Sequence, residues 1–493
     1  MDCMMRAIGR IARALCNPGT FGVLLGAGGL LSCTDPADPD NIYQGGDLTV
    51  FDNTTMAYDT PSHIIEEHEL FFNRFLDGDL LYDLDRVANP APVEGTGGLG
   101  PLYCGKSCAT CHAGTGRTKS TLFTHGGSGY DFSTFLAFMR TPNDQYHREY
   151  GRVLHDHAVF PYRPEGRLTV EYTALDGEPS EPCDPDEECT TKSCYHFPTP
   201  DNEKYCIIKP RYKIVDWYPE DIPEDQLEIS VRTPLRHVGL GLMLAVDREE
   251  LKALAAKDYP EYGISPKLQW VYERGKWEIG LSGHKAQHAD LTVELGFLSD
   301  IGVTSARFPD EICYGQEECE EDFGIEISSR DMADVDMYMH NTGVPARRNV
   351  DAPKVKRGQA LFREARCHLC HTPTLHTGPK PVRLIDGTEL PHLANQTIHP
   401  YSDFLLHDMG PQLGDEFSQW NATGDEWRTA PLWGGGLQEI VNGHTQYLHD
   451  GRARNLIEAI MWHREEEGAV SYEIFRHMPK ADRDALIAFV KSL

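Results

Sequence analysis

Cys367-His368-Leu369-Cys370-His371 and Cys108-Ala109-Thr110-Cys111-His112 are two copies of one pattern, Cys-x-x-Cys-His. Two thiols one helical turn apart can each form a thioether with a haem vinyl group, and the histidine after the second thiol can then reach the iron. The pattern therefore predicts two covalently attached c-type haems. A zinc ion or a redox-active dithiol is the alternative, but the histidine repeated in both copies favours haem. The predicted attachment residues are Cys108, Cys111, Cys367 and Cys370, and the predicted proximal ligands are His112 and His371.

The first 32 residues have the layout of an export signal. Three arginines between residues 6 and 13 precede an apolar run, residues 21–31, which is too short to span a bilayer. The run ends in Leu30-Leu31-Ser32-Cys33, which resembles the lipobox of bacterial lipoproteins and predicts lipidation of Cys33. An ordinary signal peptide that ends near a cysteine is the alternative. Since thioether attachment occurs outside the bacterial cytoplasm, we expect a lipid-anchored protein on the periplasmic side of a membrane, the outer membrane rather than the inner.

Composition is typical of a globular protein, with 40% apolar and 10% aromatic residues, and 493 residues are enough for two domains. The net charge of −30 argues against nucleic-acid binding. It favours a basic partner, such as a small electron-carrying cytochrome in the periplasm. No segment after the signal is apolar enough to cross a membrane, so the lipid anchor is the expected membrane contact.

The 14 cysteines divide by expected role. Two belong to the signal, Cys33 to the lipid, and four to the haems. The other seven predict three disulfides and one remaining thiol in an oxidising compartment, with Cys104 as our choice for the thiol. Cys313 and Cys319 are close enough for a local bridge, and residues 181–206 resemble a disulfide-stapled surface insertion.

Periodicity and punctuation predict a mostly α protein with two cytochrome c-like haem domains and long irregular loops. We expect a tether at 33–60, an N-terminal haem domain at 61–345 that carries the 181–206 insertion, and a C-terminal cytochrome c-like haem domain at 346–493. Apolar residues at helical spacing predict helices at 61–76, 247–256, 330–340, 354–365 and 481–493. Gly358 and Phe362 resemble the small and aromatic contact positions of the first cytochrome c helix, and 481–493 would be the closing helix.

Five segments carry a resemblance to a known family: 98–117 (GLGPLYCGKSCATCHAGTGR), 232–246 (RTPLRHVGLGLMLAV), 360–373 (ALFREARCHLCHTP), 400–410 (PYSDFLLHDMG) and 426–463, which contains TAPLWGGG and YLHDGRARN. They are similar to the bacterial di-haem c-type oxidoreductases described as peroxidases or thiol oxidoreductases. That family resembles the di-haem cytochrome c peroxidases and the methylamine dehydrogenase maturase. The resemblance runs with gaps from about residue 64 to 493 and leaves out the insertion.

The resemblance implies that one haem transfers electrons and the other meets the oxidant. It implies a second ligand to the C-terminal haem from a helix after His449-Asp450-Gly451, a position that falls on His463. Met409 and Met461 are the competing candidates. A His371/His463 pair would lower the potential relative to ligation by histidine and methionine.

The distal side of the first haem is less decided by sequence, and its catalytic residue stays unknown. Where relatives have a glutamate this chain has Leu244, and where they have a tryptophan it has His284. A substitute base or a sixth ligand could come from His284, His155, His157 or His125, although each alone is an ordinary histidine. Arg428, Arg452 and Arg454 could pair with haem propionates or be surface charges.

The sequence therefore predicts a di-haem oxidoreductase that reduces a peroxide, with electrons passing from the C-terminal haem to the N-terminal haem. A non-catalytic electron-transfer cytochrome is the first alternative. An oxygenase or protein-modifying oxidase of the same superfamily is the second. Whether calcium lies between the domains is left open.

Overall fold

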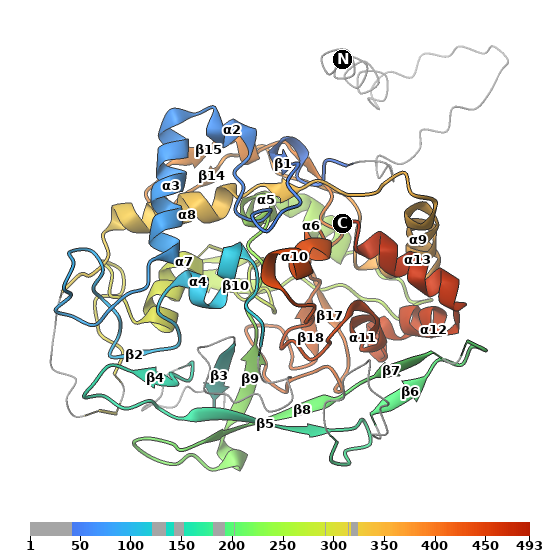
Figure 1. Cartoon of the computed structure of the whole chain (residues 1–493), viewed down its shortest axis with the longest axis horizontal. Helices are drawn as coiled ribbons and strands as arrows, with labels where there is room; N and C mark the ends of the chain where they lie inside the picture. The colour runs from blue at the N-terminus through green and yellow to red at the C-terminus, as the bar shows by residue number, and fades with distance from the viewer. Residues whose placement is uncertain are drawn as a thin grey trace. The chain divides into compact units, whose positions relative to one another are not determined.

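Two pairs of crossed helices carry the fold of the computed structural model, one on each side of the view in Figure 1. Helix α3 (Glu69–Asp83) packs on α8 (Ser329–Asn341), and α9 (Pro353–Glu364) packs on α13 (Lys480–Val490). The first Cys-x-x-Cys-His motif, in α4 (Cys108–Cys111), follows α3, and the second, in the short helix η6 (Cys367–Leu369), follows α9. The structure describes residues 42–120, 135–141, 152–180, 193–201, 203–290, 292–313, 315–316 and 324–493.

Both helix pairs use the same contact. A Cβ on Gly78 would overlap the Asp334 carbonyl oxygen, and a Cβ on Gly358 would overlap the Ala485 carbonyl oxygen. Four residues further along each helix, aromatic rings meet. The ring centroids of Tyr82 and Tyr338 are 5.1 Å apart, and those of Phe362 and Phe489 are 5.2 Å apart. Glycine lets the backbones approach, and the ring pair then fills the space beside the crossing.

The predicted helices are confirmed, with one division. Helices α6 (Arg248–Ala255), α8, α9 and α13 lie where periodicity places them, and Ser328 caps α8 by accepting from the Asp331 amide. The helix expected over 61–76 is split into α2 (His63–Glu66) and α3. His68 leaves helical geometry between them and its ring accepts from the Phe71 amide at 3.3 Å, so it caps α3.

The prediction of a mostly α fold is wrong, since 30% of the described residues are helical, 19% are in strands, and the sheets they form are many and short. In the described residues the strands pair two by two. The longest pairs are β5 (Arg167–Thr173) with β8 (Lys209–Val215), and β3 (Leu136–Arg140) with β9 (Glu228–Arg232). These two pairs enclose a separate apolar core of Phe135, Met139, Leu168, Ile214 and Val231. The antiparallel pair of β5 and β8 runs along the lower edge of Figure 1.

The remaining elements are short. The other hairpins are β6 (Cys194–His196) with β7 (Lys204–Cys206), β10 (Trp270–Glu273) with β11 (Lys276–Ile279), and β17 (Leu406–Asp408) with β18 (Glu426–Arg428). Two-residue pairs are β1 (Thr49–Val50) with β12 (Val344–Pro345), β2 (Leu102–Tyr103) with β4 (His157–Ala158), β13 (Leu375–His376) with β16 (Thr397–Ile398), and β14 (Val382–Arg383) with β15 (Glu389–Leu390). The other helices are α5 (Leu240–Ala245), α7 (Thr292–Leu295), the π-helix η5 (Gly296–Ile301), α10 (Gln438–Asn442), α11 (Leu456–Met461) and α12 (Ala469–His477).

The segment expected to be a tether belongs to the folded unit from residue 42 onward. Residues 42–493 form one unit by their contacts, and β1 pairs with β12 in parallel. Leu48 and Tyr58 are buried, and the Tyr58 hydroxyl donates to the Gly434 carbonyl at 2.6 Å. Cys33 and the expected signal lie outside the described residues. No helix in the described part of the chain is both long and apolar enough to cross a membrane.

The cysteines differ from the expected three disulfides. Cys194 and Cys313 are disulfide-bonded. Cys104 and Cys206 are both thiols, and Cys104 Sγ donates to the Leu154 carbonyl at 3.3 Å. Two thiols among the seven leave room for two disulfides rather than three. Cys183, Cys189 and Cys319 lie outside the described residues.

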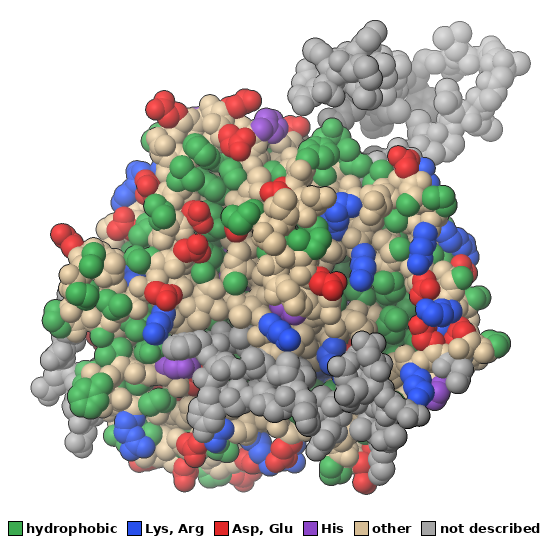
Figure 2. Space-filling model, viewed as in Figure 1, with side chains coloured by type: hydrophobic (Ala, Val, Ile, Leu, Met, Phe, Trp, Pro, Cys, Tyr) green, Lys and Arg blue, Asp and Glu red, His purple; other side chains and the backbone are tan. Residues whose placement is uncertain are grey.

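Acidic side chains gather over α2 and α3, at the upper left of the face in Figure 2. The sequence of α3 alone supplies Glu69, Asp77, Asp79 and Asp83 to this region. The local charge therefore has the same sign as the net charge of the chain.

Replacing Gly358 with alanine should lower the free energy of unfolding by roughly 1–3 kcal/mol, because the new Cβ must push α9 away from the Ala485 carbonyl. Chemical denaturation followed by circular dichroism measures the loss. Gly378→Ala is the matched control, since its Cβ would meet only ordinary contacts at 3.7 and 3.8 Å and should change stability by less than about 0.5 kcal/mol. Equal losses in the two variants would contradict the proposed role of the crossing.

Candidate functional site

Both motifs open onto the same cavity, which has a volume of about 500 Å³. Cys111 and His112 line it from the first motif, and Cys367, Cys370 and His371 line it from the second. Most of its other lining residues come from 232–243, 282–300, 427–435 and 447–471. The structure therefore brings together two motifs that lie far apart in the sequence.

The two motif histidines are held in the same way. His112 Nδ1 lies 2.8 Å from the Leu235 carbonyl oxygen, and His371 Nδ1 lies 2.9 Å from the Tyr401 carbonyl oxygen. A carbonyl only accepts, so Nδ1 carries the proton and Nε2 keeps its lone pair. Burial lowers the pKa of each ring to about 4, which keeps both neutral at pH 7. This is the state in which imidazole binds a metal ion through Nε2.

His463 has the same preparation, just after α11. Its Nδ1 donates to the Ala459 carbonyl at 2.8 Å, and burial lowers its pKa. His371 and His463 both line the cavity, and after burial the charge interaction with His463 is the next cause that lowers the pKa of His371. Met409 also lines the cavity, whereas Met461 is fully buried in the adjoining core and is not part of the lining. His463 and Met409 therefore stay as candidates for a second ligand beside His371.

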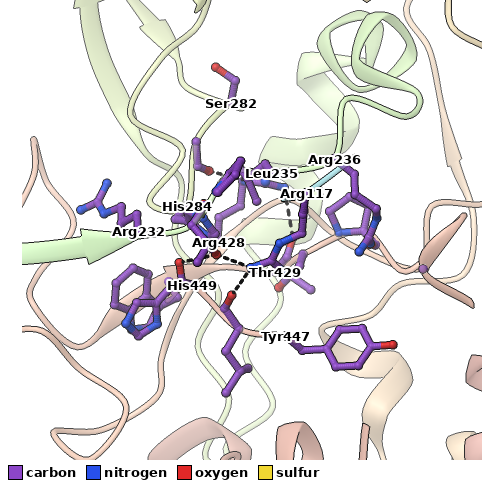
Figure 3. Close-up of a pocket in the computed structure, with 18 of the residues that line it drawn as sticks. Arg117, Arg232, Leu235, Arg236, Ser282, His284, Arg428, Thr429, Tyr447 and His449 are labelled. Carbon is purple, nitrogen blue, oxygen red and sulfur yellow. Dashed lines mark hydrogen bonds between the residues drawn. The ribbon is translucent and has the colours of Figure 1, made fainter. Parts of the chain in front are cut away.

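Three buried arginines face the cavity without an acidic partner (Figure 3). Burial lowers the pKa of Arg117 to about 9 and those of Arg232 and Arg428 to about 10. Among the described residues their hydrogen-bond partners are carbonyl, hydroxyl or amide oxygens, such as Leu448 O, Gln419 Oε1 and Gly283 O. Arg117 Nε and Arg232 Nη2 have no partner there.

This lining fits haem. A buried cation without a counter-charge costs several kcal/mol, so the cavity suits a ligand that brings carboxylates of its own. Haem has two propionates, an apolar ring and vinyl groups, which match the arginines, the apolar walls and the paired thiols. Of the three arginines proposed from sequence as propionate partners, only Arg428 lines the cavity. Arg452 pairs with Asp450 at 2.8 Å, and Arg454 pairs with Glu458 at 2.7 Å.

The histidines considered as catalytic candidates are distributed differently. His284 lines the cavity, and its Nε2 donates to the Thr233 carbonyl at 2.8 Å. His155 is buried away from the lining, between Glu165 at 2.9 Å and the Ser299 carbonyl at 3.0 Å. His157 pairs with Asp156 at 2.8 Å and does not line the cavity. His125 lies outside the described residues. Of the candidates that the structure describes, only His284 can meet a ligand in this cavity.

Leu244, which stands where relatives have a glutamate, is not part of the cavity lining. Leu240 and Met243 of α5 line the cavity, but Leu244 packs against the neighbouring apolar core instead. Leu244 therefore contributes no side chain to the cavity lining.

Sequence reasoning missed several polar residues of the site. Lys285 is fully buried with its Nζ 4.0 Å from the centre of the Trp427 ring, whose stacking partner is His449 at 3.8 Å. His407 lies between Glu467 at 2.5 Å and Asp403 at 2.9 Å, and its Nδ1 is 3.4 Å from Cys370 Sγ. Arg117, Arg232 and His407 all lie inside the family segments quoted above. The family resemblance was therefore the signal that could have identified them as site residues.

The described residues contain no group of three or more His, Cys, Asp or Glu side chains arranged to hold a metal ion. Calcium between the domains, which the sequence left open, gains no candidate ligand group from the described residues.

Comparison with known proteins gives one match. A family model described as "Di-haem oxidoreductase, putative peroxidase" matches residues 40–131 and 218–493. No curated protein and no solved structure matches. The unmatched residues 132–217 contain strands β3 to β8, which include the longest strand pair, β5 with β8.

If His463 is the second ligand beside His371, His463→Met should raise the midpoint potential of that haem, because methionine favours the reduced iron. The shift should be a sizeable part of the roughly 0.8 V range that axial ligands span. A spectroelectrochemical titration measures it, and Met409→Leu is the matched control with no expected change. A shift in Met409→Leu and none in His463→Met would assign the ligand to Met409.

Proposed function

Because the chain belongs to the di-haem oxidoreductase family, we propose that it reduces a peroxide with electrons that pass between two covalently attached c-type haems. Membership makes the protein an oxidoreductase that uses haem. The observation that carries the finer proposal is that both motifs line one cavity, each with a histidine whose Nε2 is available as a ligand.

The two motifs have unequal surroundings, which supports unequal roles. His371 and His463 would both hold the iron of the haem on Cys367 and Cys370, an arrangement suited to electron transfer. His112 would hold the haem on Cys108 and Cys111 and leave a position for peroxide. When bound, the haems supply the redox-active iron. We propose that electrons enter at the C-terminal haem and leave for peroxide at the N-terminal one.

The protein's own residues bind, orient and exclude water. Arg117, Arg232 and Arg428 would bind the propionates and so fix both rings in the cavity. The crossed helix pairs would support each Cys-x-x-Cys-His motif on the side away from its haem. In the second pair, the ring centroids of Phe362 and His371 are 6.3 Å apart. The buried aromatic side chains Trp433 and Phe404 belong to the apolar core, which would exclude water from the interior.

The setting of the protein is also a proposal. Cys33 would carry a lipid that anchors the chain to the periplasmic side of the outer membrane, with no other membrane contact. The acidic surface over α2 and α3 supports a basic electron donor, such as a small cytochrome, and disfavours nucleic acid.

A second candidate function is a non-catalytic electron-transfer cytochrome. His237 stacks on His112 with ring centroids 4.1 Å apart, and His284 also lines the cavity. A second histidine on the first iron would close it to peroxide. An oxygenase or protein-modifying oxidase would instead leave the same iron open.

Electron paramagnetic resonance and peroxide turnover test the proposal together. We expect one high-spin and one low-spin ferric haem in the fully oxidised protein, and consumption of two electrons from a reduced cytochrome per hydrogen peroxide. Cys108→Ser/Cys111→Ser should remove the peroxide reaction and leave the C-terminal haem redox-active. Two low-spin haems that do not react with peroxide would favour the carrier, and turnover with dioxygen but not peroxide would favour the oxygenase.

A further inference from the structure

A histidine outside the sequence candidates lines the cavity with a buried carboxylate behind it. His288 Nδ1 lies 3.2 Å from Glu273 Oε1, and His288 is part of the cavity lining. Glu273 is on β10 and only 4% exposed. Its second oxygen accepts from the amides of Ala289 at 3.0 Å and Asp290 at 2.9 Å. The carboxylate is therefore fixed by the backbone on both sides of the histidine it holds.

The charge of Glu273 sets the state of the ring. Burial alone would raise the pKa of Glu273, but the hydrogen bonds from His288, Asp290 and Ala289 hold it below its ordinary value. An ionised carboxylate only accepts, so His288 Nδ1 donates to it, and in the neutral ring the lone pair is then on Nε2. Nε2 makes no hydrogen bond to any described residue. A carboxylate that orients an imidazole whose other nitrogen is free is the arrangement of a general base.

The other cavity histidines do not share this arrangement. His112, His371 and His463 each donate Nδ1–H to a backbone carbonyl, which suits iron ligation through Nε2. His284 uses its Nε2 in a hydrogen bond to the Thr233 carbonyl. Among the described histidines of the lining, His288 and His407 alone direct Nδ1 at a carboxylate, and His407 uses both nitrogens on carboxylates. Of the two, His288 is thus the one whose Nε2 is left for a ligand in the cavity.

The backbone holds His288 firmly and links it to the first motif. The amides of Leu281 and Ser282 donate to the His288 carbonyl at 2.9 and 3.0 Å. The chain then continues through α7 into the π-helix η5, which lines the cavity with Ser299 and Asp300. The Asp300 carbonyl accepts from the amides of Cys104 at 2.7 Å and Gly105 at 3.0 Å, directly before Cys108. This wall of the cavity therefore ends at the first haem-attachment site.

We propose that His288 is the catalytic acid–base residue for peroxide at the first haem and that Glu273 is its positioning residue. The inference rests on the proposed function. His288 would then take the role of the glutamate that relatives have at the position of Leu244, although the two residues lie on different elements.

In the proposed cleavage of hydrogen peroxide, His288 Nε2 takes the proton from one oxygen and returns it to the other oxygen as the O–O bond breaks. The electron pair of that bond leaves with the second oxygen, which departs as water. The remaining oxygen atom takes up two electrons, delivered by a reduced one-electron donor through the haems, and two solvent protons to give a second water. The sum is H2O2 + 2 e⁻ + 2 H⁺ giving 2 H2O.

His288→Gln in the haem-loaded protein tests the assignment by two measurements. The first is the second-order rate constant for the peroxide-induced change in the Soret band. The second is the rate of cyanide association with the ferric protein, which needs no turnover, since hydrogen cyanide must lose its proton to bind. We expect His288→Gln to lower the peroxide rate constant by roughly 10²–10⁴-fold and to slow cyanide association, because the base is absent.

His376→Gln is the matched control. His376 has the same kind of partner, with its Nδ1 3.3 Å from Glu250 Oε1, but it is exposed and does not line the cavity. His376→Gln should leave both rates unchanged. Glu273→Gln, which keeps the shape but removes the charge, should give a smaller loss in both rates with an unchanged haem spectrum, and so confirms a positioning role.

The two proposals fail differently. If wild-type protein does not react with peroxide, the proposed function fails, and slower cyanide association in His288→Gln still places His288 at the ligand position. If His288→Gln matches His376→Gln within about twofold in both rates, the inference about His288 is overturned, whatever the wild-type protein does with peroxide.

Discussion

Buried guanidinium groups that face the cavity and form no ion pair with a described carboxylate are the constraint on which the rest of the site depends. Arg117, Arg232 and Arg428 are buried, and burial lowers the pKa of all three. Unpaired cations in a protein interior are costly, so such a site is stable only with an anionic occupant. Elsewhere in the same interior, arginine charges are matched, as in the pair of Arg452 with Asp450. The imbalance is local to the cavity, where the two Cys-x-x-Cys-His motifs also lie. A pair of haems resolves it with four propionates.

The two helix crossings explain how the motifs reach this cavity from different parts of the chain. Gly78 and Gly358 each bring a helix against the carbonyl of its partner, and an aromatic pair follows four residues later in both cases. The repeated contact gives each motif a rigid support of the same design. A rigid support matters for electron exchange, because a ligand histidine must keep its orientation while the iron changes charge. In the proposed function, the residues that differ between the two motifs, such as His463 and His288, give each haem its separate role.

Sequence patterns predicted local features well and distant ones poorly. The motif histidines, α9 and α13 follow from spacing within one segment, including the roles of Gly358 and Phe362. The equivalent contact of Gly78 with Asp334 was not predicted, because nothing in either sequence segment points to the other. The strands β3 to β8 were missed for a second reason: they are short, lie between irregular loops, and fall in residues 132–217, where the family pattern gives no guidance. Site residues such as Arg117, His288 and Glu273 were missed because only the fold brings them to the cavity. The expected tether also proved partly folded, since Tyr58 is buried and bonded to Gly434.

The mass of the denatured protein, measured together with its haem spectrum, tests the central claim most directly. Covalent attachment at both motifs predicts a mass greater than that of the polypeptide by two haem groups, with the colour retained after extraction with acidified acetone. Cys367→Ser/Cys370→Ser should reduce the excess to one haem. A colourless protein that carries zinc on the four thiols, or haem that is lost on extraction, would contradict the account.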